Sequence, residues 1–184
     1  MITKKGFTLI ETLVAISVLV VAIAAPLSLA SQSLFSAYYA KDQLIASHLA
    51  QEAIEIVRQK RDHNLLLILR DPLRDRGDWL LDTQLQGVSN GTKKIVTVDV
   101  EDISNLTFTL VDQALGIDDT LAVLKHNGSI YNHSNGNDTR FKRVLELKKI
   151  SDSEIEVVAR VKWQTGSFRP RTFTIKENLY NWIP

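Results

Sequence analysis

The most prominent pattern in the chain is a long apolar segment near its N-terminus. Residues 7–30 are almost entirely apolar, and no charged residue occurs between Glu11 and Lys41. A helix of about 20 apolar residues is long enough to cross the hydrocarbon core of a bilayer. The basic pair Lys4 and Lys5 precedes this segment, which places the N-terminus in the cytoplasm and the rest of the chain outside it. We therefore predict a single-pass membrane protein with an exported C-terminal part.

A secretory signal peptide is the alternative explanation of this segment. Two features argue against it. The apolar run is longer than the hydrophobic region of a typical signal peptide, and the helical pattern continues through residues 27–40 without a turn signal. Pro26 lies inside the run and predicts a kink or a local opening of the helix, because proline removes one helical hydrogen bond.

The pattern changes after Lys41, but its helical period does not. Apolar residues recur at steps of three and four and form one stripe: Ala46, Leu49, Ala50, Ala53, Ile54 and Val57. One helix is thus predicted from Phe7 to about Arg61, roughly 80 Å long at 1.5 Å per residue. We expect residues 7–34 to form its membrane half, and residues 35–62 to pack on a folded head.

The head is predicted to be rich in β-structure. Asp71-Pro72 ends any helical pattern, and residues 62–92 are expected to be irregular, with turns at 76–78 and 90–91. Beyond them, apolar and polar residues alternate around positions 96–100, 106–110, 141–147, 155–163 and 173–175, with plausible hairpin turns at 126–128 and 151–153. The predicted fold is α+β: a long N-terminal helix packed by its second half on a small antiparallel sheet, with residues 63–184 as the globular head.

Composition excludes several classes of function. The 184 residues contain no cysteine, so neither a disulfide framework nor a cysteine metal site is possible. The net charge of +1 does not favour nucleic acid as a partner of the whole chain. No phosphate-binding loop, HExxH pair or nucleophile elbow is present, so we expect neither an enzyme nor a cofactor.

Glu11 is the unusual residue of the predicted span. A carboxylate at the start of a membrane helix is costly and normally has a partner. The segment between Gly6 and Lys41 contains no Lys, Arg or His. Either the partner of Glu11 comes from outside this helix, or Glu11 lies close enough to the interface to reach water.

The sequence Lys4-Lys5-Gly6-Phe7-Thr8-Leu9-Ile10-Glu11 resembles the processing site of type IV prepilins and pseudopilins. The resemblance implies a leader of residues 1–6 that a membrane aspartyl peptidase removes by cutting after Gly6. It also implies N-methylation of Phe7, and pairing of Glu11 with the N-terminal amine of a neighbouring subunit. Other pilin subunits, the prepilin peptidase and an inner-membrane assembly platform are the partners implied.

Weaker similarities extend into the head. Residues 50–58, Phe141-x-Arg143, Val161-x-Trp163 and Leu179-x-x-Trp182 resemble minor pilins related to the I-type pseudopilins. They imply a minor structural subunit of a type IV pilus or a type II secretion-like filament, exposed at the cell surface after assembly. Two alternatives remain. One is a DNA-binding minor pilin of an uptake apparatus, and the other is a single-pass membrane protein with an unrelated receptor-like head.

Three other groups of residues are candidate sites. His126, His133, Asp118, Asp119 and Asp138 are near one another in sequence, but loop His and Asp are usually only solvated, so no metal site is predicted. The Asn-rich segment 127–138 lacks the ligand spacing of a calcium loop and is interpreted as an exposed loop. The last strands are basic, which could attract DNA, but acidic residues are interspersed and favour an ordinary mixed-charge surface. The basic residues are Lys142, Arg160, Lys162, Arg169, Arg171 and Lys176.

Overall fold

A computed structural model of the chain describes residues 6–71, 73–80, 83–100, 106–111, 123–166 and 169–183. The chain divides into two compact units, residues 1–41 and residues 42–184. The predicted leader charges Lys4 and Lys5 lie outside the described residues.

Helix α1 (Leu9–Arg70) contributes to both units. Thr8 caps its first turn, because its hydroxyl and its carbonyl accept from the backbone N–H groups of Glu11 and Thr12 at 3.4 and 3.2 Å. The helix is continuous through Pro26, and the kink predicted there stays a prediction. By length and composition, the apolar part of α1 is able to cross a membrane.

The hydroxyl groups of the apolar part bond back to the helix that carries them. Thr12 Oγ1 donates to the Leu9 carbonyl at 2.8 Å, Ser17 Oγ to Val14 at 2.7 Å, and Ser31 Oγ to Leu27 at 3.0 Å. An unpaired hydroxyl is costly in an apolar medium. These hydroxyls therefore do not need a water molecule as an acceptor.

The prediction that the helix ends near Arg61 is wrong, because α1 continues to Arg70. Asn64, Leu65 and Ile68 are buried and extend the apolar stripe by two further turns. The side-chain amide of Asn64 also donates to the Trp79 carbonyl at 3.2 Å. The helix ends at Arg70, because Pro72 sterically disfavours the helical conformation of the residue before it, Asp71. Residues 76–80 then form a short 3₁₀ helix, η1 (Arg76–Leu80), where only irregular chain was expected.

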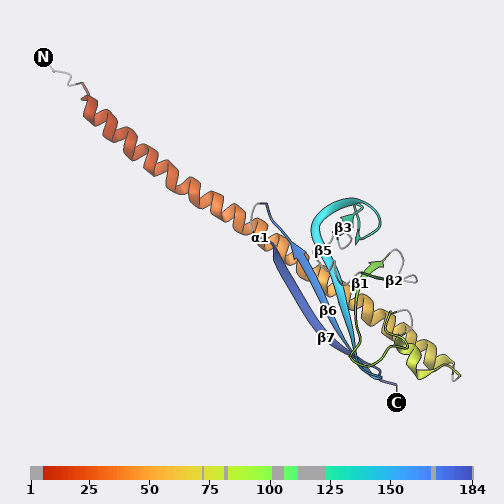
Figure 1. Cartoon of the computed structure of the whole chain (residues 1–184). Coiled ribbons are helices and arrows are strands. Elements are labelled where there is room, and N and C mark those ends of the chain that lie inside the picture. The colour runs from red at the N-terminus through yellow and green to blue at the C-terminus, as the bar shows by residue number, and fades with distance from the viewer. Residues whose placement is uncertain are drawn as a thin grey trace. The chain divides into compact units, whose positions relative to one another are not determined.

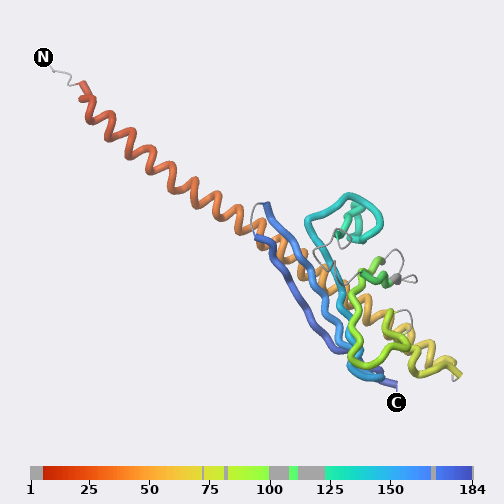
Figure 2. The backbone as a smooth tube through the Cα atoms, viewed as in Figure 1, coloured from red at the N-terminus to blue at the C-terminus, as the bar shows by residue number. Residues whose placement is uncertain are grey.

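The sheet of the head has seven described strands, and every pairing between them is antiparallel, as predicted. The strands are β1 (Lys93–Val100), β2 (Leu106–Leu110), β3 (Val123–His126), β4 (Tyr131–Asn132), β5 (Asn137–Ser151), β6 (Glu154–Trp163) and β7 (Arg171–Tyr180). Strand β5 is the centre of the sheet. It pairs with β6 along one side, and with β3 and β1 in succession along the other. Figure 2 shows β5 curving at its N-terminal end towards β3.

The part of α1 in this unit crosses one face of the sheet (Figure 1). Ala46, Ala50 and Ala53 are fully buried, and such small side chains allow the helix backbone to approach the strands closely. The alternation of β5 and β6 places one set of apolar side chains towards the helix. The buried members are Phe141, Leu145, Leu147, Ile155, Val157, Ala159, Val161 and Trp163.

Both predicted hairpin turns are present. The β5–β6 turn brings Ser151 opposite Glu154. In the β3–β4 turn, Asn127 Oδ1 accepts from the backbone N–H groups of Ser129 and Ile130, both at 3.0 Å. Gly128 follows with φ of 100°, a left-handed conformation that glycine adopts without steric cost.

Candidate functional site

The first candidate site is the start of α1. Gly6 lies just before the helix, and a Cβ added to it would meet no atom within 4 Å of any described residue other than its chain neighbours. Packing within the described chain therefore does not require glycine at this position. Phe7 and Ile10 expose 79% and 72% of their surface.

Glu11 lies in the first turn of α1, where a carboxylate interacts favourably with the positive end of the helix dipole. Its side chain is exposed and forms no ion pair with another described residue. The structure therefore provides Glu11 with a helix end but not with a cation from the described part of its own chain.

An apolar surface of unusual extent surrounds these residues. Every described side chain from Gly6 to Tyr38 is exposed, and most of them are apolar. Soluble monomers rarely expose contiguous apolar patches of more than a few hundred Å². An apolar surface of this extent marks a region of contact with a membrane or with other proteins.

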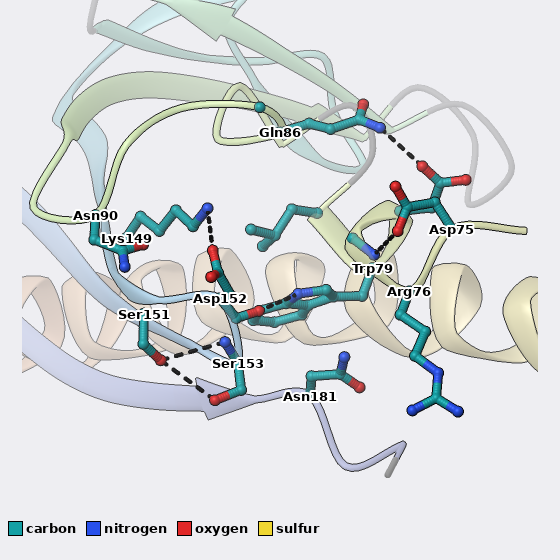
Figure 3. Close-up of a pocket in the computed structure, with 14 residues that line it drawn as sticks. Asp75, Arg76, Trp79, Gln86, Asn90, Lys149, Ser151, Asp152, Ser153 and Asn181 are labelled. Carbon is teal, nitrogen blue, oxygen red and sulfur yellow. Dashed lines mark hydrogen bonds and ion pairs between the residues drawn. The ribbon is translucent and has the colours of Figure 1, made fainter.

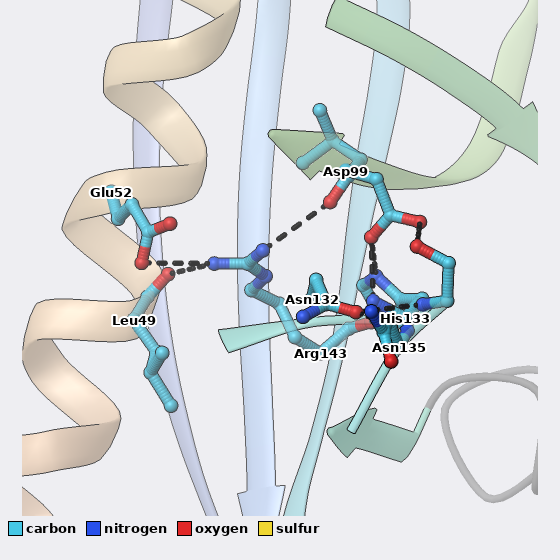
Figure 4. Close-up of polar contacts among 9 residues, drawn as sticks. Leu49, Glu52, Asp99, Asn132, His133, Asn135 and Arg143 are labelled. Carbon is cyan, nitrogen blue, oxygen red and sulfur yellow. Dashed lines mark hydrogen bonds and ion pairs between the residues drawn. The ribbon is translucent and has the colours of Figure 1, made fainter. Parts of the chain in front are cut away.

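The second candidate site is a buried polar cluster in the head, centred on Arg143 of β5 (Figure 4). Arg143 is 1% exposed and lies between α1 and β1. Its Nη1 donates to the Leu49 carbonyl at 3.2 Å and is 3.3 Å from Glu52 Oε2, while Nη2 donates to the Val98 carbonyl at 3.3 Å. Burial lowers the pKa of Arg143, and the charges of Glu52 and Asp99 oppose that effect. This arrangement joins the helix to the sheet and offers no reactive group.

His133 belongs to the same polar cluster as Arg143. Its Nδ1 is 2.9 Å from Asp99 Oδ1, and its Nε2 is 3.3 Å from the Arg143 carbonyl. Both ring nitrogens are therefore engaged. His126 accepts from the Gly128 backbone N–H at 3.2 Å instead. Among the residues that the structure describes, no three His, Cys, Asp or Glu side chains come together to hold a metal ion, and Asp118 and Asp119 lie outside those residues.

Two acidic residues of the head have lowered pKa values. Burial alone would raise the pKa of Asp99, but hydrogen bonds from the His133 side chain and backbone, with a contribution from Ser134, lower it overall. Burial likewise opposes ionisation of Glu146, but hydrogen bonds from Lys93 and Arg160 outweigh it and lower the pKa. Both side chains are stabilised as carboxylates by the folded head.

These shifts predict the sign of the acid dependence of stability. A carboxyl group with a lowered pKa stabilises the fold above its unfolded value, and that stabilisation is lost as the pH falls through the folded value. The ordinary values are 3.8 for Asp99 and 4.5 for Glu146. We expect the urea midpoint of the full chain in detergent to fall below about pH 4.5. The variant D99N should be less stable at neutral pH and show a shallower decline, and an unchanged slope would contradict the assignment.

An open pocket of about 800 Å³ lies between η1, the β5–β6 turn and the end of β7 (Figure 3). Its polar groups bind one another. Trp79 Nε1 donates to the Asp152 carbonyl at 2.9 Å, and Lys149 Nζ is 2.9 Å from Asp152 Oδ1. These contacts hold η1 against the β5–β6 turn. The polar groups that line the pocket therefore have a structural role.

The basic residues of the last strands are interspersed with acidic partners, as the sequence indicated. Arg160 Nη1 is 2.6 Å from Glu146 Oε2, and Lys93 Nζ is 2.7 Å from Glu146 Oε1. Lys176 pairs with Glu156. The middle of this face is therefore a mixed-charge surface.

Sequence reasoning did not identify Arg143 as a functional side chain, although a signal was present. Arg143 lies two or four positions from Phe141, Leu145 and Leu147 in the same strand. Successive side chains of a strand point to opposite faces, so Arg143 lies on the same face as these apolar residues. A basic residue at an apolar position predicts a buried polar contact. No comparable signal marks Glu52 or Asp99, because their partners are distant in the chain.

Comparison with known proteins concerns the start of the chain. Residues 1–25 match the family model of the prokaryotic N-terminal methylation motif, which is the signature of type IV prepilins and pseudopilins. No curated protein and no solved structure matches the chain. The match includes Gly6, Phe7 and Glu11, but it does not reach the head.

Proposed function

We propose that this chain, which carries the methylation motif of prepilins and is pilin-like, is a minor structural subunit of a type IV pilus or a related secretion filament. The observation that carries the proposal is the position of the motif at the head of an exposed apolar helix. A helix with this surface can pack against lipid and, after assembly, against the helices of other subunits. The motif belongs to structural proteins and not to an enzyme family.

In this proposal, the chain is first a single-pass membrane protein. The leader with Lys4 and Lys5 stays in the cytoplasm, and the head is exported. The prepilin peptidase cuts between Gly6 and Phe7 and methylates the new terminal amine. The open surroundings of Gly6 support this role, because packing among the described residues gives no steric reason for glycine at this position.

Assembly then moves the apolar half of the helix from the membrane into the filament. Glu11 has no cationic partner in the described part of its own chain, and an ionised carboxylate in an apolar environment requires one. The terminal amine of Phe7 in a neighbouring subunit would supply that charge. The same pairing would set the axial position of one subunit against the next.

The minor role rests on the similarities within the head and on the absence of cysteine, which excludes a disulfide loop. Assignment to one filament, a pilus or a secretion apparatus, is open within the proposal, and so is the position of the subunit at the tip or along the shaft. The middle of the basic face does not support the DNA-binding alternative. Lys93 and Arg160 pair with Glu146 there, and Lys176 pairs with Glu156.

Mass spectrometry of the N-terminal peptide tests the proposal directly. We expect the chain from membranes of its native host to begin at Phe7 with one added methyl group. The variant G6V should keep residues 1–6, because a branched side chain replaces the glycine next to the cut, while V14A inside the span should be processed normally. A native chain that begins at Met1, or one cut beyond Ala30, would exclude the prepilin pathway.

A further inference from the structure

The β3–β4 turn begins with an exposed Asn-Gly dipeptide, Asn127-Gly128. Asparagine followed by glycine is able to lose its side-chain amide, because the backbone nitrogen of the glycine can attack the asparagine Cγ. Glycine favours this reaction, since it has no side chain to hinder the approach. The chain contains two further Asn-Gly dipeptides, Asn90-Gly91 and Asn135-Gly136. The surroundings of each dipeptide in the fold therefore decide how fast it reacts.

The attacking nitrogen of Gly128 lies next to a base. Its N–H donates to His126 Nδ1 at 3.2 Å. A ring nitrogen that accepts a hydrogen bond carries no proton, so it is able to take one. Histidine is the side chain that most often acts as a general base, and such proton transfer typically accelerates a reaction by about 10²–10⁴-fold.

His126 is held in this position by residues outside the turn. Its ring centroid lies 4.7 Å from that of Tyr131 in β4. Gly136 packs so closely against the His126 backbone that an added Cβ would be 2.6 Å from the His126 carbonyl carbon. The position of the base is therefore fixed by β4 and by the segment that leads into β5.

The side-chain amide of Asn127 is activated at its oxygen. Oδ1 accepts from the backbone N–H groups of Ser129 and Ile130, both at 3.0 Å. These bonds hold the side chain over the turn that contains the Gly128 nitrogen. When that nitrogen attacks Cγ, negative charge develops on Oδ1, and donors already aimed at the oxygen stabilise it as in an oxyanion hole.

The dipeptide Asn90-Gly91 has different surroundings. The Gly91 N–H donates to the Lys149 carbonyl of β5 at 2.7 Å. A backbone carbonyl does not act as a base at neutral pH, and attack on Asn90 would require this hydrogen bond to break. Both Asn90 and Asn127 are followed by glycine and then by a hydroxyl residue, so their intrinsic reactivity is similar. Asn90 is therefore an internal control for the effect of the fold.

We propose that Asn127 is a site of self-catalysed deamidation, in which His126 acts as the base. The Gly128 nitrogen forms a bond to Cγ of Asn127, and His126 Nδ1 accepts the proton that this nitrogen loses. The C–N bond of the side-chain amide then breaks, and the amide group leaves with that proton as ammonia. Water opens the resulting succinimide to aspartate or isoaspartate. The turn gains a negative charge, which lowers the formal net charge of +1 by one unit.

Peptide mapping of the full chain in detergent measures this reaction. The chain is incubated at neutral pH in water labelled with heavy oxygen and is then cut with trypsin. Peptides 77–93 and 126–140 contain Asn90 and Asn127, and fragment ions locate the converted residue. We expect Asn127 to convert at least about tenfold faster than Asn90 in the folded chain, and to incorporate the label. In urea, the two residues should convert at about equal rates.

Two histidine variants identify the base. H126Q keeps a side chain that accepts the Gly128 N–H but does not take its proton, and should slow conversion of Asn127 by about tenfold or more. H63Q makes the same change at an exposed histidine of α1 and should leave the rates at Asn90 and Asn127 unchanged. Tryptophan fluorescence shows whether each variant is folded. The comparison of Asn127 with Asn90 in the unaltered chain does not depend on the folding of H126Q.

Three results would overturn the proposal. The first is equal conversion of Asn127 and Asn90 in the folded chain. The second is a folded H126Q variant that converts Asn127 as fast as the unaltered chain does. The third is slower conversion of Asn127 in the folded chain than in urea, because the fold would then protect the residue instead of activating it. The reaction needs only residues of the head, so these results are independent of any role in a filament.

Discussion

Replacement of Glu11 by glutamine is expected to leave membrane insertion and processing intact and to remove the subunit from assembled filaments. The substitution keeps the size and the helical preference of the side chain but eliminates its charge. A neighbouring Phe7 amine would then be transferred into the apolar filament core without a partner. Loss of one member of a buried ion pair costs about 3–5 kcal/mol, which corresponds to at least about a hundredfold less incorporation. Quantitative immunoblotting of sheared filaments and of membranes measures both pools.

Two further variants make this result specific. E55Q makes the same chemical change in the same helix but within the head, where Glu55 forms a surface pair with Arg58, and should assemble normally. E11D keeps the charge on a shorter side chain and should recover part of the incorporation. Normal filament levels of E11Q would contradict the pairing of Glu11 with the neighbouring amine.

The second large effect is expected at Arg143. The variant R143A should lower the free energy of unfolding of the head by about 3–5 kcal/mol, because a fully buried guanidinium is removed from Leu49, Glu52 and Val98. Urea unfolding of the full chain in detergent, followed by tryptophan fluorescence, is the suitable measurement. Trp79 and Trp163 are 1% and 4% exposed, so both report on the packing of the head.

A methionine at the same position separates packing from polar contacts. R143M fills most of the volume without a charge and should recover about 1–2 kcal/mol relative to R143A. R160A removes a partly exposed arginine that pairs with Glu146, and should cost about 1 kcal/mol or less. An R143A variant as stable as R160A would show that the buried cluster does not join the helix to the sheet.

The start of the chain could be interpreted in detail from sequence because a membrane imposes a simple rule on it. Length and apolarity alone distinguish a lipid-facing helix from the charged sequence that follows. The motif around Gly6 and Glu11 consists of residues close together in the chain, so the sequence alone is enough to identify it. The strands of the head were predictable for a similar reason, since one covered face produces a period of two.

The features that were missed depend on contacts between distant residues. The predicted helix ended near Arg61 and so did not include the buried positions Asn64, Leu65 and Ile68, the first of which donates to the Trp79 carbonyl of η1. The sequence places Lys142 and Lys162 in different strands, and only the register reveals that they are direct neighbours. The register of strand pairing is determined by tertiary packing, which local pattern does not encode.

The back-bonded hydroxyls of Thr12, Ser17 and Ser31 affect how the apolar helix exchanges one surrounding for another. Each hydroxyl keeps its acceptor whether the outer surface of the helix meets acyl chains or neighbouring side chains. Transfer between those two media therefore breaks no hydrogen bond and exposes no new polar atom at these positions. Under the proposed function, movement of the helix from the bilayer into a filament would therefore leave the hydrogen bonds of these three hydroxyls intact.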